Sequence, residues 1–237
     1  MNIEEFSKEL INKSNMIEVS LNEDQANRFY AYMNLLVEWN EKINLTAITE
    51  PNEVILKHFI DSLTICNYID KGSSIIDVGT GAGFPGIPLT IANEVNVTLL
   101  DSLNKRINFL NEVIKELDLE NIEAIHSRAE DFGSKEREKY DIATSRAVAS
   151  LNVLVEYLLP LVKVGGRCIC MKGPQIEEEI ENAKKAIKIL GGEIEKVDEI
   201  ELPESDIKRT IIIIKKVKET PTKYPRKAGL PSKEPIM

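Results

Sequence analysis

The chain has few of the residues that build metal sites. It contains three cysteines and two histidines in 237 residues. Cys168 and Cys170 lie two residues apart in an apolar, strand-like run, which is not the spacing of a zinc site, and Cys66 stands alone. With only His58 and His126 as further ligands, we expect no metal site and interpret the cysteines as small core residues.

Long apolar runs are also absent. No stretch of eighteen apolar residues occurs, and the first ten residues, MNIEEFSKEL, are acidic, so we expect neither a membrane span nor a secretory signal. The composition, 43% apolar and 29% charged, is that of an ordinary globular protein. The sequence therefore predicts a cytoplasmic protein with one large domain, or one domain with an appendage.

The whole chain has no net positive charge, but its C-terminal part does. The net charge is −9, although residues 208–237 hold nine basic residues and two acidic ones. This C-terminal stretch carries +7, which leaves −16 on residues 1–207. An acidic body with one basic edge is typical of a protein that meets a phosphate backbone through a local patch.

Glycines are concentrated in one stretch, SSIIDVGTGAGFPG, at residues 73–86. A short apolar run leads through Asp77 into Gly79, Gly81, Gly83 and Gly86. This pattern predicts a buried strand, a glycine loop and then a helix. Glycines at this density let a ligand approach the backbone, and the helix N-terminus favours an anionic or polar group. We interpret the loop as a ligand cradle.

The glycine loop allows two interpretations. Gly81, Gly83 and Gly86 fit G-x-G-x-x-G, and Asp101 lies twenty residues beyond Gly81, as in nicotinamide-binding proteins. From Asp77, the same stretch is D-x-G-x-G-x-G, which resembles the first motif of class I S-adenosylmethionine-dependent methyltransferases. In both, an acidic residue such as Asp101 holds ribose hydroxyls. The loop alone does not distinguish them.

The first seventy residues show only helical patterns. Ser20 and Glu23 fit a capping box, S-x-x-E, ahead of a long amphipathic pattern, and Pro51 starts another helix that contains His58. His58 is interpreted first as an ordinary helix histidine. We predict that residues 1–70 form a helical cap, residues 71–218 the cofactor-binding domain and residues 219–237 a basic tail.

From residue 73 onward, strand and helix patterns alternate, which predicts right-handed crossovers and a parallel sheet. Residues 165 and 166 predict a glycine turn into a strand at 167–171. The last two strand patterns, 193–202 and 210–217, have no helix between them and must pair antiparallel. A parallel sheet closed by one antiparallel strand favours the methyltransferase interpretation over the nicotinamide one.

Polar residues follow the predicted strands at their carboxyl ends, where ligands bind in open parallel sheets. Asp101 and Ser102 follow the second strand, Ala129 and Glu130 the third, and Arg146 the fourth. Asp101 fits a ribose-binding role, with capping of the next helix as the alternative. For Arg146 the alternatives are contact with both donor and target base, or an ion pair with Glu130 or Asp77.

Six further runs carry a closer likeness: NLTAIT, GTGAGFPGIPLTIA, LLDSLNKRINFL, HSRAEDF, TSRAVASL and YPRKAGLPSKEPI. Together they resemble the bacterial small-subunit ribosomal RNA guanine-N7 methyltransferases, the glucose-inhibited division protein B family, over essentially the whole chain. The resemblance implies an α/β fold of the class I methyltransferase type: a Rossmann-like, mostly parallel seven-stranded sheet with one antiparallel strand and an N-terminal helical cap.

The same resemblance implies the cofactor, the target and the site. S-adenosylmethionine is expected as methyl donor, with S-adenosylhomocysteine as product, and 16S ribosomal RNA or the small subunit as partner, at a guanine in the 530 stem-loop region. We expect a monomer. The resemblance places donor binding on Gly79, Phe84, Ala129, Glu130 and Arg146. With the motif residues, the predicted cofactor site is Asp77, Gly79, Gly81, Gly83, Phe84, Asp101, Ser102, Ala129, Glu130 and Arg146.

The expected chemistry needs few catalytic groups. A guanine N7 has a free lone pair and no proton to remove, so alignment and electrostatics suffice. After the fourth predicted strand stands TSRAVAS, which contains neither an N/D-P-P-Y/F motif nor a cysteine nucleophile. Arg146 is the predicted catalytic residue. The predicted RNA-binding residues are Lys223, Tyr224, Arg226, Lys227 and Lys233, with Tyr224 free to stack.

Two other functions remain open from sequence. One is a nicotinamide-dependent oxidoreductase. The other is a non-catalytic RNA-binding assembly factor with a vestigial donor pocket.

Overall fold

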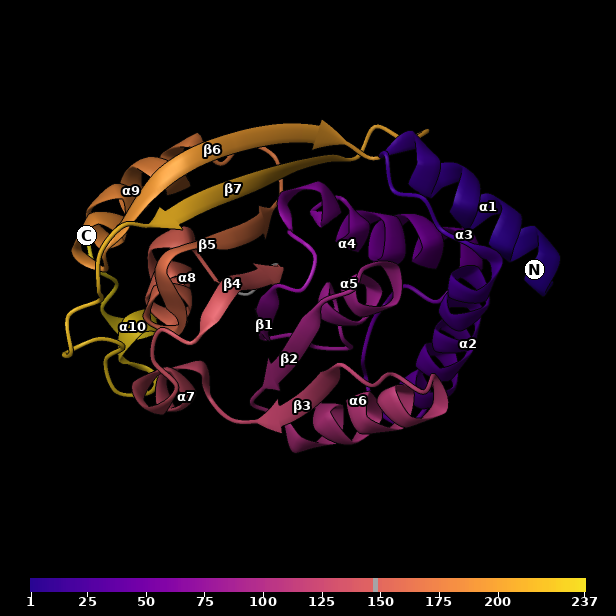
Figure 1. Ribbon diagram of the computed structural model, residues 1–237, viewed down its shortest axis with the longest axis horizontal. Helices are drawn as coiled ribbons and strands as arrows, with labels where there is room; N and C mark the ends of the chain where they lie inside the picture. The colour runs from indigo at the N-terminus through magenta and orange to yellow at the C-terminus, as the bar shows by residue number, and fades with distance from the viewer. Residues whose placement is uncertain (147–148) are drawn as a thin grey trace.

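A seven-stranded sheet forms the centre of the molecule within residues 1–146 and 149–237, the part of the chain that the computed structural model describes (Figure 1). Ala147 and Val148, in the TSRAVASL run, lie outside the described residues. The strand order is β3-β2-β1-β4-β5-β7-β6. The strands are β1 Ser74–Val78, β2 Asn96–Asp101, β3 Ile122–His126, β4 Tyr140–Arg146, β5 Val162–Lys172, β6 Gly192–Glu201 and β7 Lys208–Lys216.

Helices cover the sheet and extend the N-terminal part. They are α1 Ile3–Met16, α2 Glu23–Asn40, α3 Pro51–Val54, α4 Asp61–Leu63, α5 Gly86–Ala92, α6 Asn104–Glu116, α7 Ala129–Lys135, α8 Leu151–Leu158, α9 Glu177–Ile189 and α10 Leu230–Lys233. A π-helical stretch, η1, covers Ile55–Ile60, and 3₁₀ turns, η2 and η3, cover Cys66–Tyr68 and Leu159–Leu161. In the two described ranges, no helix combines the length and apolarity needed to cross a membrane.

The sheet has the predicted direction pattern. The pairs β1–β2, β1–β4, β2–β3 and β4–β5 are parallel, whereas β7 is antiparallel to both β5 and β6. The hairpin β6–β7 forms because its short connection cannot accommodate the crossover that a parallel pair needs. The prediction of a mostly parallel sheet with one antiparallel strand is confirmed.

Helix α2 begins at a different cap from the one expected. The side chain of Asn22 accepts the backbone N–H of Gln25 at 2.8 Å, and Gln25 accepts the N–H of Asn22 at 2.9 Å. The expected capping box at Ser20 and Glu23 was therefore wrong. Both pairs have the right spacing, but Asn22 has the extended backbone that lets its side chain turn back onto the helix.

Strand β5 is longer than predicted. It begins at Val162, so Gly165 and Gly166 lie inside the strand and not in a turn before it. Gly165 has φ +95°, and the β4–β5 register shifts between Tyr140 and Ile142. A Cβ on Gly166 would lie 2.4 Å from the Asp141 carbonyl oxygen, so the two backbones approach closely here. The glycines allow an irregularity within the strand.

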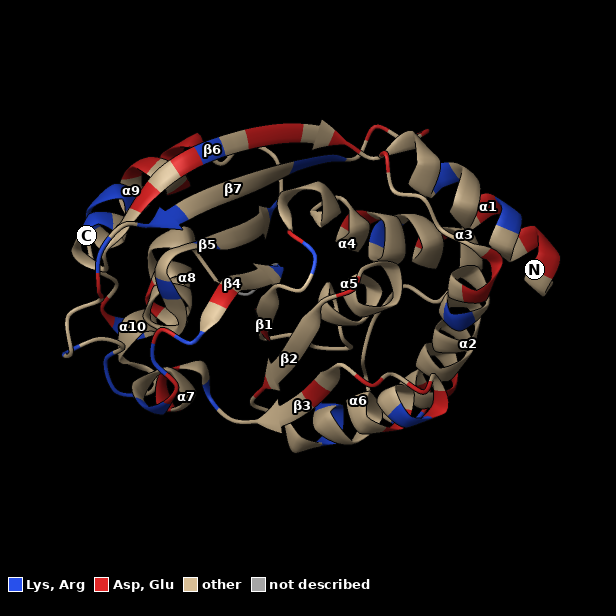
Figure 2. Cartoon of the chain, in the orientation of Figure 1, with Lys and Arg blue, Asp and Glu red and all other residues tan. Residues whose placement is uncertain are grey.

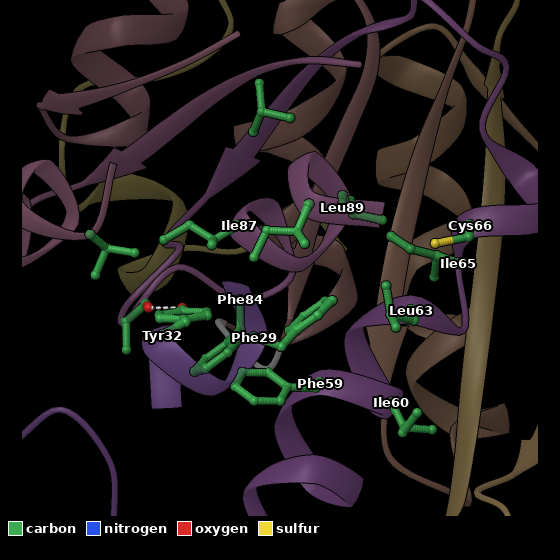
Figure 3. Packing of buried hydrophobic residues seen from close by; sticks show 14 of the residues in the cluster. Phe29, Tyr32, Phe59, Ile60, Leu63, Ile65, Cys66, Phe84, Ile87 and Leu89 are labelled. Carbon is green, nitrogen blue, oxygen red and sulfur yellow. Dashed lines mark hydrogen bonds between the residues drawn. The ribbon is translucent and has the colours of Figure 1, made fainter. Parts of the chain in front are cut away.

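The core lies on both faces of the sheet. Neighbouring strand residues alternate between the faces, so that Ile75 packs with the cap, α5 and α6, while Ile76 packs with α8 and α9. On the first face, an aromatic cluster joins the cap to the glycine loop (Figure 3). The rings of Tyr32 and Phe59 lie 5.4 and 6.1 Å from that of Phe84. The cap therefore fixes the loop that carries Phe84.

Candidate active site

Asp77 holds the glycine loop in place through hydrogen bonds to both of its ends. Its Oδ2 accepts hydrogen bonds from Thr80 Oγ1 at 2.6 Å and from the backbone N–H of Gly86 at 2.9 Å. Its Oδ1 is buried and has no partner among the described residues. The side chain is fully buried, and this burial raises the pKa of Asp77 to about 6. The carboxyl group thus closes the loop between β1 and α5.

The loop glycines have different roles. Gly81 has φ +64°, and a Cβ there would meet no atom within 4 Å, so its open side faces the cavity it lines. Gly83 has φ +99°, but a Cβ there would lie 2.4 Å from Ile87 Cδ1 and 2.7 Å from Tyr32 Oη. Gly83 is therefore a glycine because helix α5 and the cap pack against it, and not because a ligand approaches it.

Asp101 ends β2 with both carboxylate oxygens in use. Oδ1 accepts the N–H of Leu103 at 2.9 Å, and Oδ2 accepts the N–H of Gly81 at 3.0 Å and Arg106 Nη1 at 3.1 Å. A carboxylate has about four acceptor positions, so one position remains without displacing a partner. Asp101 therefore combines both expected roles: it anchors the start of α6, and it lines a cavity beside the glycine loop.

Two adjoining cavities lie at the carboxyl ends of the strands. The larger, of about 450 Å³, reaches from the glycine loop to the cap, and the smaller, of about 220 Å³, reaches to α7 and α8. Gly79, Asp101 and Ser102 line both. The larger cavity is also lined by Leu45, Thr46, His58, Thr80, Gly81, Ala82, Phe84, Arg106 and Arg146. The smaller one is also lined by Val78, Leu100, Ser127, Arg128, Ala129, Glu130, Tyr157, Gly229 and Ser232.

The structure thus brings most of the predicted cofactor residues together. Gly79, Gly81, Phe84, Asp101, Ser102 and Arg146 line the larger cavity, and Ala129 and Glu130 line the smaller. Asp77 and Gly83 line neither, since both act on the packing of the loop.

Arg146 is held by the cap. Its Nη1 donates to Asp61 Oδ2 at 3.2 Å and to the backbone carbonyls of Lys57 and His58 at 3.2 and 3.5 Å. The guanidinium also lies 4.9 Å from the centre of the Phe84 ring. The expected alternative of an ion pair with Glu130 or Asp77 was wrong, because Asp61 pairs with Arg146. Burial lowers the pKa of Arg146, yet a guanidinium stays charged in proteins.

The carbonyls of Lys57 and His58 belong to the π-helical stretch η1. The pattern after Pro51 predicts an ordinary helix, whereas the observed helix widens into a π-helical segment where Arg146 donates to its backbone. Such segments often occur at functional sites. No local sequence signal indicated this widening.

His58 reaches the site, which the sequence did not favour. Its ring stacks on Phe84 at 4.5 Å and lies at 16° to it. Burial, and secondarily the charge of Arg146, lowers the pKa of His58 to about 4. The imidazole is therefore neutral at pH 7.

A chain of hydrogen bonds fixes the tautomer of His58. Arg146 Nη2 lies 3.4 Å from Nδ1, and because a guanidinium only donates, Nδ1 accepts. The proton of the neutral ring is then on Nε2, which donates to Thr46 Oγ1 at 2.8 Å. Thr46 Oγ1 also accepts the N–H of Ile48 at 3.0 Å. The Thr46 hydroxyl proton is thus available to donate into the larger cavity. Thr46 lies in the NLTAIT run, but only the fold reveals its role.

The basic tail folds back onto the body and is only partly open to solvent. Lys223, Lys227 and Lys233 are exposed, and Figure 2 shows basic residues along this segment beside α7 and α10. Tyr224 is 8% exposed, so the expectation that its ring is free to stack was wrong. Arg226 binds the carboxylate of Glu156, with its Nη2 2.6 Å from Oε2. RNA binding by the tail stays a prediction, now centred on the exposed lysines.

Metal-ligating side chains do not gather anywhere in the part of the chain that the structure describes. No group of three or more histidine, cysteine, aspartate or glutamate residues there has the geometry to hold a metal ion.

Solved structures with the same fold include TYW2 from M. jannaschii in complex with AdoMet, with a TM-score of 0.55, 15% identity and coverage of 66% of this chain and 75% of that chain. TrmN from Thermus thermophilus has a TM-score of 0.52, 16% identity and coverage of 69% and 53%. The fold, with a ligand-sized double cavity at the strand ends, is that of a class I S-adenosylmethionine-dependent methyltransferase.

The family can be stated more closely. The GidB family model, described as rRNA small subunit methyltransferase G, matches residues 25–210. The ribosomal RNA small subunit methyltransferase G of Acetivibrio thermocellus is 58% identical, over 97% of this chain and 96% of its own length. That of Clostridium botulinum is 52% identical, over 98% and 99%. The chain belongs to the GidB family. The predicted fold class, family and cofactor are thereby confirmed, and the nicotinamide interpretation is set aside.

The residues present fit the cofactor of this class. An elongated nucleoside can extend over two adjoining pockets, and the two cavities share the lining residues Gly79, Asp101 and Ser102. Gly81 leaves open space toward the larger cavity, and Asp101 keeps one free acceptor position. The cavities therefore have the size and polarity that S-adenosylmethionine requires.

Proposed function

We propose that this protein transfers a methyl group from S-adenosylmethionine to N7 of a guanine in 16S ribosomal RNA, in the 530 stem-loop region. The names of the relatives, ribosomal RNA small subunit methyltransferase G, support a ribosomal RNA target. The sequence resemblance supports the guanine and its N7 atom. The structure adds one supporting observation, the hydrogen-bond polarity of the larger cavity.

That observation concerns Thr46 and Arg146. Both line the cavity, and both have donors: the guanidinium has no acceptor, and the Thr46 hydroxyl already accepts from His58 and Ile48. The edge of guanine next to N7 presents two acceptors, N7 and O6, whereas adenine presents an acceptor and an amino donor. A pair of donors therefore suits guanine, with O6 accepting a bond while N7 stays free to react.

We assign donor binding to the lining residues of the two cavities. Ala129 and Glu130 belong to the smaller cavity, which suits the adenine, and Asp101 and Ser102 lie between the cavities, which suits the ribose. Phe84 and Arg146 border the larger cavity at the reacting end. When bound, S-adenosylmethionine supplies an activated methyl group on a sulfonium.

The protein contributes alignment and not proton transfer. A guanine N7 has no proton to lose, and His58, the neutral imidazole in the cavity, has both ring nitrogens engaged by Arg146 and Thr46. Arg146 is held on one side by Asp61 and on another by the Phe84 ring. A fixed guanidinium and hydroxyl orient the base without rearrangement during the reaction.

Labelled methyl transfer tests this function. Purified protein, donor with a labelled methyl group and small ribosomal subunits, or 16S ribosomal RNA alone, should give label on a guanine N7, detected by borohydride and aniline cleavage of the RNA. Comparing the two substrates also shows whether the target is naked RNA or an assembled particle. Label at another atom, or on no RNA, would refute the proposal.

Thr46 offers a matched pair of variants. Thr46→Ser keeps the hydroxyl and should retain activity, whereas Thr46→Val replaces it with a methyl group of similar shape and should lower kcat/KM at least tenfold, equivalent to about 1.4 kcal/mol. Equal activities would remove the support that Thr46 gives to guanine recognition.

A non-catalytic assembly factor makes the opposite prediction at Asp101. In that case Asp101→Ala would leave salt-sensitive RNA binding intact and there would be no methyl transfer to lose. The enzyme proposed here should lose turnover on the same substitution.

A further inference from the structure

The C-terminal segment, residues 219–237, packs against the wall of the donor site. It returns past α7 and α8 and includes α10, which lies beside α8 (Figure 1). Tyr157 of α8 and Ser232 of α10 share a hydrogen bond of 2.9 Å between their hydroxyl oxygens. The Arg137 side chain donates from Nη1 to the carbonyl of Tyr224 and from Nη2 to that of Thr220. The segment is therefore bonded to the body at several points.

A buried ion pair anchors the same segment. Glu156 of α8 is fully buried, and its oxygens accept Arg226 Nε at 2.9 and 3.2 Å, Arg226 Nη2 at 2.6 Å and the Arg226 backbone N–H at 2.8 Å. Separating Arg226 would leave a buried carboxylate without its charge partner, which is strongly unfavourable. The body thus fixes the segment at Arg226, and this anchor does not depend on RNA.

Beyond this anchor, the segment contacts the smaller cavity directly. Gly229 donates its backbone N–H to Glu130 Oε1 at 2.8 Å, and Glu130 is a predicted donor-binding residue. Gly229 and Ser232 both line the smaller cavity, as does Ala129. Gly229 has φ +82°, and a Cβ there would meet no atom within 4 Å. The turn at Gly229 thus places Gly229 and Ser232 in the wall of the smaller cavity.

We propose that Gly229 and Ser232 belong to the donor-binding site, and that the C-terminal segment couples donor binding to RNA binding. The wall residues alternate with exposed lysines: Lys227 lies two residues before Gly229, and Lys233 directly follows Ser232. Phosphates bound by these lysines restrain the wall, and a nucleoside bound against the wall restrains the lysines. Such coupling is reciprocal. The inference takes the donor and the RNA from the proposed function.

The donor half is tested with the reaction product alone, without RNA or turnover. Titration calorimetry of the full chain with S-adenosylhomocysteine should show at least tenfold weaker binding for Gly229→Val, because a β-branched residue at φ +82° forces the turn to change. Gly72→Val is the matched control. Gly72 has φ +80° and equally open surroundings, but lines neither cavity, so its affinity should match wild type.

Ser232→Ala is a second variant that adds no backbone strain. It removes the bond to Tyr157 and should weaken product binding several-fold while the thermal unfolding midpoint stays close to that of wild type. In wild-type protein, the product should also slow tryptic cleavage after Lys227 and Lys233. Wild-type affinity in both variants, or a cleavage rate that the product leaves unchanged, would overturn the assignment of the wall.

Coupling is tested by RNA binding with and without product. The product should tighten binding of wild-type protein to 16S ribosomal RNA several-fold, and the double variant Lys227→Gln, Lys233→Gln should lose this gain but bind product normally in the absence of RNA. RNA affinity that does not respond to the product would overturn the coupling. Product binding that depends on Gly229, without methylation of N7, would contradict only the proposed function.

Discussion

Replacing Asp77 by asparagine should change how the stability of the protein depends on pH. The carboxyl group is fully buried, with Oδ2 bonded to Thr80 and Gly86 and Oδ1 without a partner among the residues that the structure describes. Asparagine keeps an acceptor oxygen for both bonds but cannot ionise. It places an amide nitrogen where Oδ1 lies, which costs about 1–3 kcal/mol at every pH. The pH-dependent difference between the two proteins therefore reports the charge on Asp77.

The size of the effect follows from the pKa of Asp77, which is about 6 in the folded protein against 3.8 as the ordinary value. Because folding raises this pKa, the stabilising contribution is complete below pH 3.8, where the group is protonated in both states. It is lost as the pH rises through 6. The full loss is about 3 kcal/mol, of which about 1.4 kcal/mol falls between pH 5 and pH 8.

Urea unfolding followed by circular dichroism at pH 5, 6, 7 and 8 measures this difference. Relative to Asp77→Asn, the wild-type protein should lose about 1.4 kcal/mol in free energy of unfolding from pH 5 to pH 8. Asp206→Asn, which removes an exposed carboxylate, controls for the loss of one negative charge. Parallel profiles for wild type and Asp77→Asn, or a difference of opposite sign, would refute the reasoning.

Three further predictions follow from the site. NMR titration of the His58 ring should give a midpoint near pH 4. Because folding lowers this pKa, the free energy that the neutral ring contributes to folding should be complete above pH 6.5 and lost as the pH falls through 4. A midpoint near 6.5 would contradict this. Gly83→Ala should lower the free energy of unfolding by about 1–3 kcal/mol more than Gly165→Ala. The two glycines have similar backbone angles, φ +99° at Gly83 and +95° at Gly165, but of the two only Gly83 lacks room for a Cβ. Equal losses of stability in urea unfolding would exclude that explanation. Arg146→Lys keeps the charge but loses the planar group over Phe84, so kcat/KM for labelled transfer should fall at least tenfold, and unchanged kcat/KM would argue against this role.

The sequence predicted those parts of the fold that depend on local pattern and on connection length. Alternating strand and helix patterns were enough to predict a parallel sheet, and the short connection between residues 202 and 208 was enough to predict the antiparallel hairpin. Polar residues after each strand also indicated the site, because parallel strands place their carboxyl ends on one edge. Residues 101, 102, 129, 130 and 146 were found in this way.

Contacts between segments distant in sequence were not predictable. His58 and Asp61 lie in the cap, more than eighty residues before Arg146, and nothing in their local pattern shows that they bond to it, or that Thr46 bonds to His58. Similarly, the basic tail suggested a free RNA-binding arm, although its Arg226 is paired with a buried glutamate on α8. A charge count does not distinguish a solvated cation from one that is already neutralised.

The aromatic cluster has a practical consequence for fragment design. Phe84 borders the larger cavity on one side and packs against Tyr32 and Phe59 on the other. An expression clone that starts at residue 71 would remove both neighbouring rings and uncover the apolar face of the sheet beneath them. Ligand screening therefore has to use protein that includes residues 1–70, even when only the nucleoside pocket is of interest.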